Sequence, residues 1–382
     1  MHKVRCRRSP STDRGKRPGG YDSGIDTSRP VHHYLLLLET DLNRVFSRSL
    51  GSVAVAELEG VTRALLAAEH RPTDVTVTSL GRATGLSFSS SADPDALDRL
   101  LGQLSCGLAL FEQTPGDSTT LTPRPLTESL VYDTDLVSVQ RYRGKTNERL
   151  TRAMLNLALA NAGIGLTGPW DRTPTVLDPM CGRGTTLNWA LCYGLNAVGI
   201  EPDAGSLRHY DGFLRTWAKQ HRLPHKHQGY RPNNAEQRHT TLDVAPTRAA
   251  QKAGDGQRVE TFNADGGDRS LAIKRGSIDA IVADLPYGIQ HRADQARLDP
   301  ADTLELLARV APTWRRWLRK GGSVCVAWNV KRASRVDVAV ALAEAGLLER
   351  VPDHDLAHGP DHGMEHVVDS TITRDVLVAV AR

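Results

Sequence analysis

The chain has 382 residues, of which 40% are hydrophobic, and a formal net charge of +4. This length suits two domains, and the apolar runs are strand-sized, which excludes an evident membrane span. The five cysteines are scattered without CxxC spacing, so we expect no disulfide framework, no metal site and a cytoplasmic location.

Residues 1–30 hold eight Lys/Arg and three Asp, with almost no apolar content. The other 352 residues then hold 40 Lys/Arg and 41 Asp/Glu, so they are nearly neutral. A segment with as little apolar content as residues 1–30 cannot bury enough surface to offset its ordering entropy. We expect a disordered basic tail, which is either a dispensable extension or an arm that touches phosphates.

Residues 31–115 have the pattern of a small α+β domain. Strands are predicted at 34–38, 74–78, 84–89 and 107–111, and helices at 52–68 and 95–101. The Thr-, Pro- and Gly-rich stretch that follows predicts a linker over residues 116–140.

Residues 141–382 alternate strand-like and helical segments, which is typical of a doubly wound, Rossmann-like α/β sheet. The five strands that this pattern predicts are 174–178, 196–200, 258–263, 278–284 and 322–328. Helices are expected at 150–162 and 304–318, and a closing strand pair at 347–351 and 376–381.

A polar stretch at 206–258 holds ten Lys/Arg, four Asp/Glu and five His. Its first third is predicted to be helical, and the remainder is long for a structureless loop. It is either a flexible surface loop or an electrostatic contact for a polynucleotide. The histidines lack the tight spacing of a metal site.

Residues 176–186 read Val-Leu-Asp-Pro-Met-Cys-Gly-Arg-Gly-Thr-Thr, a buried strand that runs into a glycine turn and a helix. Asp178 ends the strand, where ligands of such sheets bind. Gly182 and Gly184 would let backbone amides approach a ligand closely. Leu187 stands where a dinucleotide motif needs a third glycine, which disfavours NAD.

Acidic residues end the next predicted strands. Glu201 could accept both hydroxyls of a ribose, and Asp265 could accept from an adenine amino group. Each could instead be a helix N-cap. Three acids at successive strand ends, with Asp284 as the last, favour a ligand site.

The segment Asp284-Leu285-Pro286-Tyr287 suits the grip of a planar amine. An exocyclic amine on a base is a poor nucleophile, because its lone pair is delocalised into the ring. Asp284 and a backbone carbonyl could accept its two N–H groups, while Pro286 stiffens the turn and Tyr287 stacks on the base. The alternative is an ordinary exit from a strand.

The glycine-turn segment resembles motif I of the class I S-adenosylmethionine-dependent methyltransferases, and 284–288 resembles motif IV of their amino-methylating branch. Residues 141–148 are similar to the motif X region of the THUMP-associated tRNA guanine-N2 methyltransferases. The resemblance implies a seven-stranded methyltransferase sheet over 141–382 and S-adenosyl-L-methionine as cofactor. The cofactor residues that it implies are Asp178, Cys181, Gly182, Gly184, Glu201, Asp265, Thr146 and Asn147. It implies that Asp284, Pro286 and Tyr287 hold the target base.

Two features depart from that family. Leu285 replaces the commoner first proline of motif IV, and residues 31–130 are short for a ferredoxin-like part plus a full THUMP domain. Residues 34–61 resemble the start of the ferredoxin-like part. The resemblance implies methylation of guanosine N2 in tRNA, with RNA as partner and a small activator subunit left open. The alternatives are a DNA amino-methyltransferase acting on adenine N6 or cytosine N4, a protein-amide methyltransferase, and a catalytically silent nucleic-acid-binding module.

Overall fold

The structure is a computed structural model. It describes residues 29–40, 44–114, 116, 118–142, 144–229, 239–286, 302–350, 364–368 and 372–382. The basic tail predicted over residues 1–30 lies almost wholly outside the described residues. None of the described helices combines the length and apolar character that crossing a membrane requires.

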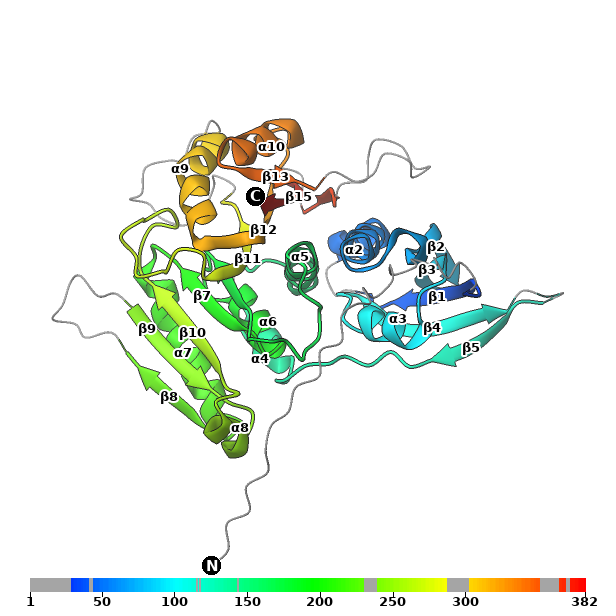
Figure 1. Cartoon of the computed structure of the whole chain (residues 1–382), viewed down its shortest axis with the longest axis horizontal. Coiled ribbons are helices and arrows are strands. Elements are labelled where there is room, and N and C mark those ends of the chain that lie inside the picture. The colour runs from blue at the N-terminus through cyan, green and yellow to red at the C-terminus, as the bar shows by residue number, and fades with distance from the viewer. Residues whose placement is uncertain are drawn as a thin grey trace, which may run out of the picture. The chain divides into compact units, whose positions relative to one another are not determined.

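The N-terminal sheet is antiparallel, with strand order β2-β3-β1-β4-β5 (Figure 1). Its strands are β1 (His32–Leu38), β2 (Thr73–Leu80), β3 (Ala83–Ser90), β4 (Gly107–Thr114) and β5 (Thr120–Arg124). Its helical segments are α1 (Arg44–Arg48), α2 (Leu50–Leu65), η1 (Ala68–His70) and α3 (Pro94–Leu101). The first four strands with α2 and α3 follow the β-α-β-β-α-β order of a ferredoxin-like unit.

Strand β5 corrects one prediction, because it lies within the stretch expected to be a linker. It pairs with β4 in the register Leu110↔Arg124 to Thr114↔Thr120. Pro123 is tolerated there, since an edge strand leaves one side of its backbone without a ladder. Arg124 adds a hydrogen bond of 2.7 Å to Asp98 on α3.

The second sheet has the order β13-β15-β12-β11-β6-β7-β10-β9-β8, with β14 paired to β15. Its strands are β6 (Thr175–Asp178), β7 (Asn196–Ile200), β8 (His225–Gln228), β9 (His239–Val244), β10 (Gln257–Phe262), β11 (Ile278–Asp284), β12 (Leu318–Asn329), β13 (Leu347–Glu349), β14 (His366–Val367) and β15 (Thr373–Ala381). Seven of them, from β13 to β10, form the predicted doubly wound core, with β15 antiparallel to both neighbours.

Strands β8 and β9 form an antiparallel pair that extends this core beyond β10. One interpretation of the sequence was that the region between 221 and 256 is a flexible loop. Strands β8 and β9 show that part of it belongs to the sheet. A short helix, α8 (Arg248–Ala253), follows β9. Residues 230–238, between the two strands, are not described.

Helices cover both faces of the sheet (Figure 1). The helices are α4 (Asp135–Ser138), α5 (Glu148–Asn161), α6 (Thr185–Cys192), α7 (Ala204–Gln220), α9 (Asp302–Trp317) and α10 (Arg335–Glu344). Side chains of α5, α6 and α7 join one apolar cluster, and those of α9 and α10 join another. Val176 and Leu177 belong to different clusters, because neighbouring residues of a strand point to opposite faces.

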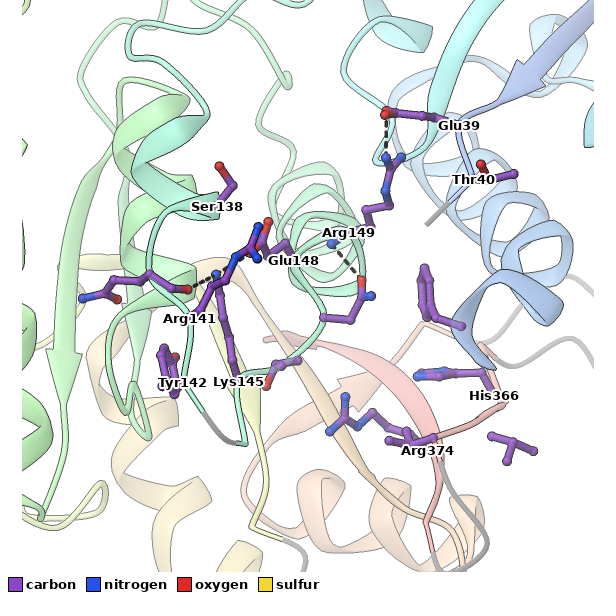
Figure 2. Close-up of a pocket in the computed structure, with 16 residues that line it drawn as sticks. Glu39, Thr40, Ser138, Arg141, Tyr142, Lys145, Glu148, Arg149, His366 and Arg374 are labelled. Atoms are coloured by element: carbon purple, nitrogen blue, oxygen red, sulfur yellow. Dashed lines mark hydrogen bonds and ion pairs between the residues drawn. The ribbon is translucent and has the colours of Figure 1, made fainter. Parts of the chain in front are cut away.

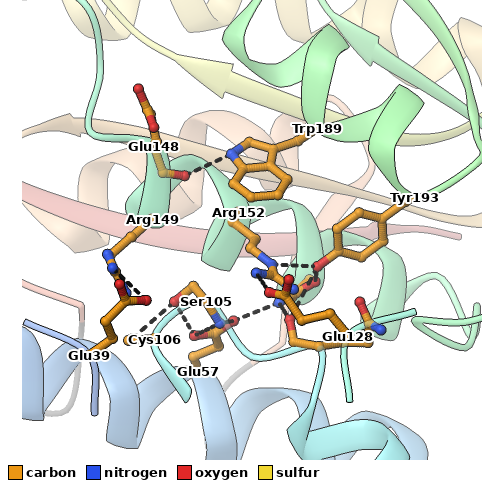
Figure 3. A network of polar contacts seen from close by, with 12 residues as sticks. Glu39, Glu57, Ser105, Cys106, Glu128, Glu148, Arg149, Arg152, Trp189 and Tyr193 are labelled. Atoms are coloured by element: carbon orange, nitrogen blue, oxygen red, sulfur yellow. Dashed lines mark hydrogen bonds and ion pairs between the residues drawn. The ribbon is translucent and has the colours of Figure 1, made fainter. Parts of the chain in front are cut away.

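A buried polar network links α2 of the first sheet to α5 (Figure 3). Glu57 is fully buried and accepts hydrogen bonds from the Ser105 amide at 3.0 Å and from the Asn156 side chain at 2.7 Å. Asn156 in turn accepts from the Tyr193 hydroxyl at 2.6 Å, to which Arg152 donates at 3.0 Å. Burial raises the pKa of Glu57, and these donors only partly oppose that shift.

Candidate active site

The predicted acids gather at one edge of the second sheet. Strands β6, β7, β10 and β11 are parallel to their neighbours in this group, so their carboxyl ends lie on the same side. Asp178 and Asp284 are the last residues of β6 and β11, and Glu201 follows β7 directly. Asp265 lies three residues beyond β10.

Asp178 is almost completely buried, with 6% of its surface exposed. Its carboxylate accepts a hydrogen bond of 3.0 Å from the Met180 amide. Burial raises the pKa of Asp178 to about 7, and the nearby charges of Asp284 and Glu201 raise it further, while hydrogen bonds oppose the shift. A cation placed beside this carboxylate would favour its ionised form.

The glycine turn has two left-handed residues, Gly182 (φ 52°) and Gly184 (φ 82°). A Cβ at Gly184 would lie 2.3 Å from the Tyr210 ring of α7, whereas a Cβ at Gly182 would meet no atom within 4 Å. The space beside Gly182 is therefore open to a ligand. Cys181 is buried against Gly199 of β7, so its side chain packs within the protein.

Glu201 ties the glycine turn to the start of α7. One carboxylate oxygen accepts from the Gly182 amide at 3.0 Å, and the other accepts from the Asp203 amide at 2.8 Å. The side chain therefore lies beside the turn, and its contact with a ribose stays a prediction.

Asp265 pairs with Arg309 of α9 at 2.5 and 3.1 Å, and it also accepts from the Gly267 amide at 2.8 Å. Desolvation raises the pKa of Asp265, but the hydrogen bonds from Arg309 outweigh it, and the pKa is lowered overall. An adenine amino group would have to share this carboxylate with Arg309. No sequence motif marks Arg309.

Asp284 is held by residues from two distant segments. The Thr146 hydroxyl donates to its Oδ2 at 2.5 Å, and the Arg374 guanidinium lies 3.4 Å from the same oxygen. The resemblance had implied that Thr146 lies by the cofactor's methionine tail. Arg374 lies on β15, and nothing local in the sequence distinguishes it as a site residue.

The structure places two of the three remaining predicted site residues. Asn147 caps α5 and accepts from the amides of Arg149 and Leu150 at 2.9 and 3.1 Å. Pro286 is exposed just after β11. Tyr287 lies outside the described residues.

A cavity of about 630 Å³ reaches Thr146 and Arg374, which both contact Asp284 (Figure 2). Its charged lining residues are Glu39, Arg141, Lys145, Glu148, Arg149 and Arg374. Four cations therefore face two carboxylates. Arg149 pairs with Glu39 at 2.8 Å, and Lys145 contacts Glu148 as well as the Gln140 carbonyl at 2.8 Å.

Aromatic residues line another part of the cavity. Phe46 and His366 meet edge to face, with ring centroids 5.7 Å apart. Burial lowers the pKa of His366, so its ring is neutral at pH 7. No cluster of three or more potential metal ligands occurs among the described residues.

Comparison with known proteins gives a family match. Residues 142–335, just over half of the chain, match the model of UPF0020, "RMKL-like, methyltransferase domain". No curated protein sequence matches the chain.

Several solved structures are similar at low identity. TrmN from Thermus thermophilus is 17% identical with a TM-score of 0.33, over 81% of this chain and 59% of TrmN. Geranyl diphosphate C-methyltransferase from Streptomyces coelicolor A3(2), solved with Mg²⁺, geranyl diphosphate and S-adenosyl-L-homocysteine, is 13% identical. Its TM-score is 0.34, over 65% of this chain and 92% of that one.

Proposed function

The chain belongs to the UPF0020 family of RMKL-like methyltransferase domains and uses S-adenosyl-L-methionine, and on this premise we propose that it methylates an exocyclic amine of an RNA base. The target that we favour is N2 of guanosine in tRNA. The observation that carries the proposal is the Asp284 carboxylate, held by Thr146 and Arg374 beside a cavity with a cationic lining.

The residues at the strand ends fit the cofactor. Asp178 would face the charged methionine part beside the open turn at Gly182, Glu201 would accept from the ribose, and Asp265 from the adenine. Bound S-adenosyl-L-methionine supplies a methyl group on a positively charged sulfur. The chain supplies the fixed carboxylates and the side-chain-free turn that would orient it.

Asp284 is proposed to act on the target amine. Its carboxylate would accept an N–H from the base and expose the nitrogen lone pair, with Pro286 and Tyr287 positioning the ring. Contacts from Thr146 and Arg374 keep that acceptor oriented before the substrate arrives, which lowers the reorganisation needed in the transition state.

The cavity suits a nucleotide as the group that reaches Asp284. Its volume lies within the roughly 300–1,000 Å³ typical of small-molecule sites. A surplus of two cations in the lining complements phosphate, and Phe46 and His366 offer apolar surface for a base. We further propose that the N-terminal domain runs to Arg124, since β5 belongs to its sheet.

The test is methylation of separate substrates with labelled cofactor, followed by nucleoside mass spectrometry. Bulk tRNA from a strain that lacks the protein should gain N2-methylguanosine, while duplex DNA should gain no label. Label in adenine N6 or cytosine N4 of DNA would overturn the RNA assignment. Activity of the isolated chain would also show that no activator subunit is needed.

A further inference from the structure

Helix α7 carries exposed cations along one face. Arg208, Arg215 and Lys219 are spaced by seven and four residues, which places them on one side of an α-helix. Arg222, also exposed, follows in the turn that ends the helix. We call these four residues the α7 stripe.

The opposite side of α7 fixes the direction of the stripe. Leu207, Tyr210, Leu214 and Trp217 are all buried in the apolar cluster beneath the helix. Because rotation of the helix would expose these side chains, the stripe is held toward solvent.

The stripe is poorly neutralised. Within the described part of the chain, its only ion pair joins Arg215 to Asp211 at 3.8 Å. Asp211 is itself engaged by His227 of β8 at 2.6 Å. Arg309 and Arg335, by contrast, are each paired with a carboxylate at 2.5–2.6 Å.

The position of α7 connects the stripe to the site. The helix begins three residues after Glu201, at the edge of the sheet where Asp284 lies, and runs away from it. Arg208 to Lys219 span about 16 Å at 1.5 Å per residue. A nucleic-acid strand places several phosphates over such a length.

We propose that the α7 stripe binds the phosphate backbone of the RNA substrate and guides it to the site. This inference rests on the proposed RNA function and adds a surface to it. Arg and Lys side chains attract phosphates and release their counterions, so the contact is independent of base sequence. Part of the basic region at 206–258 therefore lies on a folded helix, α7, rather than in a loop.

The experiment compares two charge-matched variants of the full chain. In the stripe variant, Arg208, Arg215, Lys219 and Arg222 are changed to Gln. In the control variant, Lys274, Arg275, Arg316 and Lys320 are likewise changed to Gln. These four residues are exposed near the amino-terminal ends of β11 and β12, on the far edge of the sheet. Affinity for bulk tRNA is measured over a series of salt concentrations, and affinity for S-adenosyl-L-homocysteine by calorimetry.

The stripe variant should bind tRNA at least about tenfold more weakly at 0.1 M salt. The slope of the logarithm of its binding constant against the logarithm of salt concentration should be smaller in magnitude by about three. The control variant should bind tRNA like the wild type, and both should keep cofactor affinity. Equal losses in the two variants, or no loss in the stripe variant, would overturn the inference and leave the methyltransferase assignment intact. Failure of the wild type to bind tRNA would instead refute the proposed RNA function, and the inference with it. Loss of binding to phosphatidylserine vesicles with tRNA binding retained would reassign the stripe to membranes.

Discussion

The hydroxyl of Thr146 donates a hydrogen bond of 2.5 Å to the carboxylate of Asp284, although 138 residues separate them in the chain. Thr146 lies just before α5 and Asp284 ends β11. The Arg374 guanidinium of β15 approaches the same oxygen to 3.4 Å. Three segments that are distant in sequence thus determine the orientation of one carboxylate.

Replacing Asp284 by Ala should strongly slow methyl transfer and leave cofactor binding unchanged. Loss of a preorganised acceptor should lower the single-turnover rate about 100-fold or more. Asp284→Asn should lose less, because its amide oxygen still accepts one hydrogen bond. Glu344→Ala, an exposed acid at the end of α10, is the control. Wild-type turnover by Asp284→Ala would refute the proposed mechanism.

Thr146→Val separates two roles for this residue. If the hydroxyl orients Asp284, the rate of transfer should fall about 10- to 100-fold, as expected for a hydrogen bond to a charged group, with cofactor affinity retained. Thr146→Ser should restore the rate. A fall in cofactor affinity at an unchanged rate would instead support a contact with the methionine tail.

Glu201→Ala should weaken cofactor binding by roughly 1.5–3 kcal/mol for each lost charged hydrogen bond. Some stability should also be lost, since the Gly182 and Asp203 amides lose their acceptor. Glu201→Gln keeps an acceptor oxygen and should lose less. Calorimetry with S-adenosyl-L-homocysteine measures the difference, and equal affinity for wild type and Glu201→Ala would exclude Glu201 from the ribose site.

The raised pKa of Asp178 predicts a dependence of stability on pH. Because the folded-state pKa of about 7 exceeds the ordinary 3.8, stability is greatest below the ordinary value and falls as pH rises through 7. This difference between the two pKa values corresponds to about 4 kcal/mol of folding free energy. The free energy of unfolding, measured with urea between pH 4 and 8, should depend much less on pH for Asp178→Asn than for the wild type. An identical slope in both proteins would mean that another group titrates.

The two glycines of the turn should differ in their tolerance of a side chain. Both have left-handed backbones, so Gly182→Ala should cost about 1–2 kcal/mol of folding free energy from strain. Gly184→Ala should cost about 1–3 kcal/mol more, because its methyl group would overlap the Tyr210 ring. Thermal unfolding measures both. Tyr210→Ala should remove the extra cost at Gly184 when the two changes are combined.

Much of the fold could be predicted because its signals are local. Strand and helix periodicity located most elements, as in β1, β7 and α5, since burial of one face leaves a repeating pattern in the chain. The strands that the pattern did not predict are β5, β8, β9 and β14, and the helices that it did not predict include α4, α8 and α10. Strands β5 and β8 are largely polar edge strands, and backbone pairing with β4 and β9 stabilises them rather than an apolar face of their own. Strand β9 lies inside the sheet and buries Leu242 and Val244.

The family, the glycine turn and the acids at the strand ends can be read from the sequence alone. These depend on residues within a few positions of one another, where glycine and a strand end set the backbone. The tertiary structure was needed to show that Thr146 and Arg374 hold Asp284, that Arg309 pairs with Asp265, and that the α7 cations face solvent. Such contacts depend on strand order and helix rotation, which no short segment of the chain specifies.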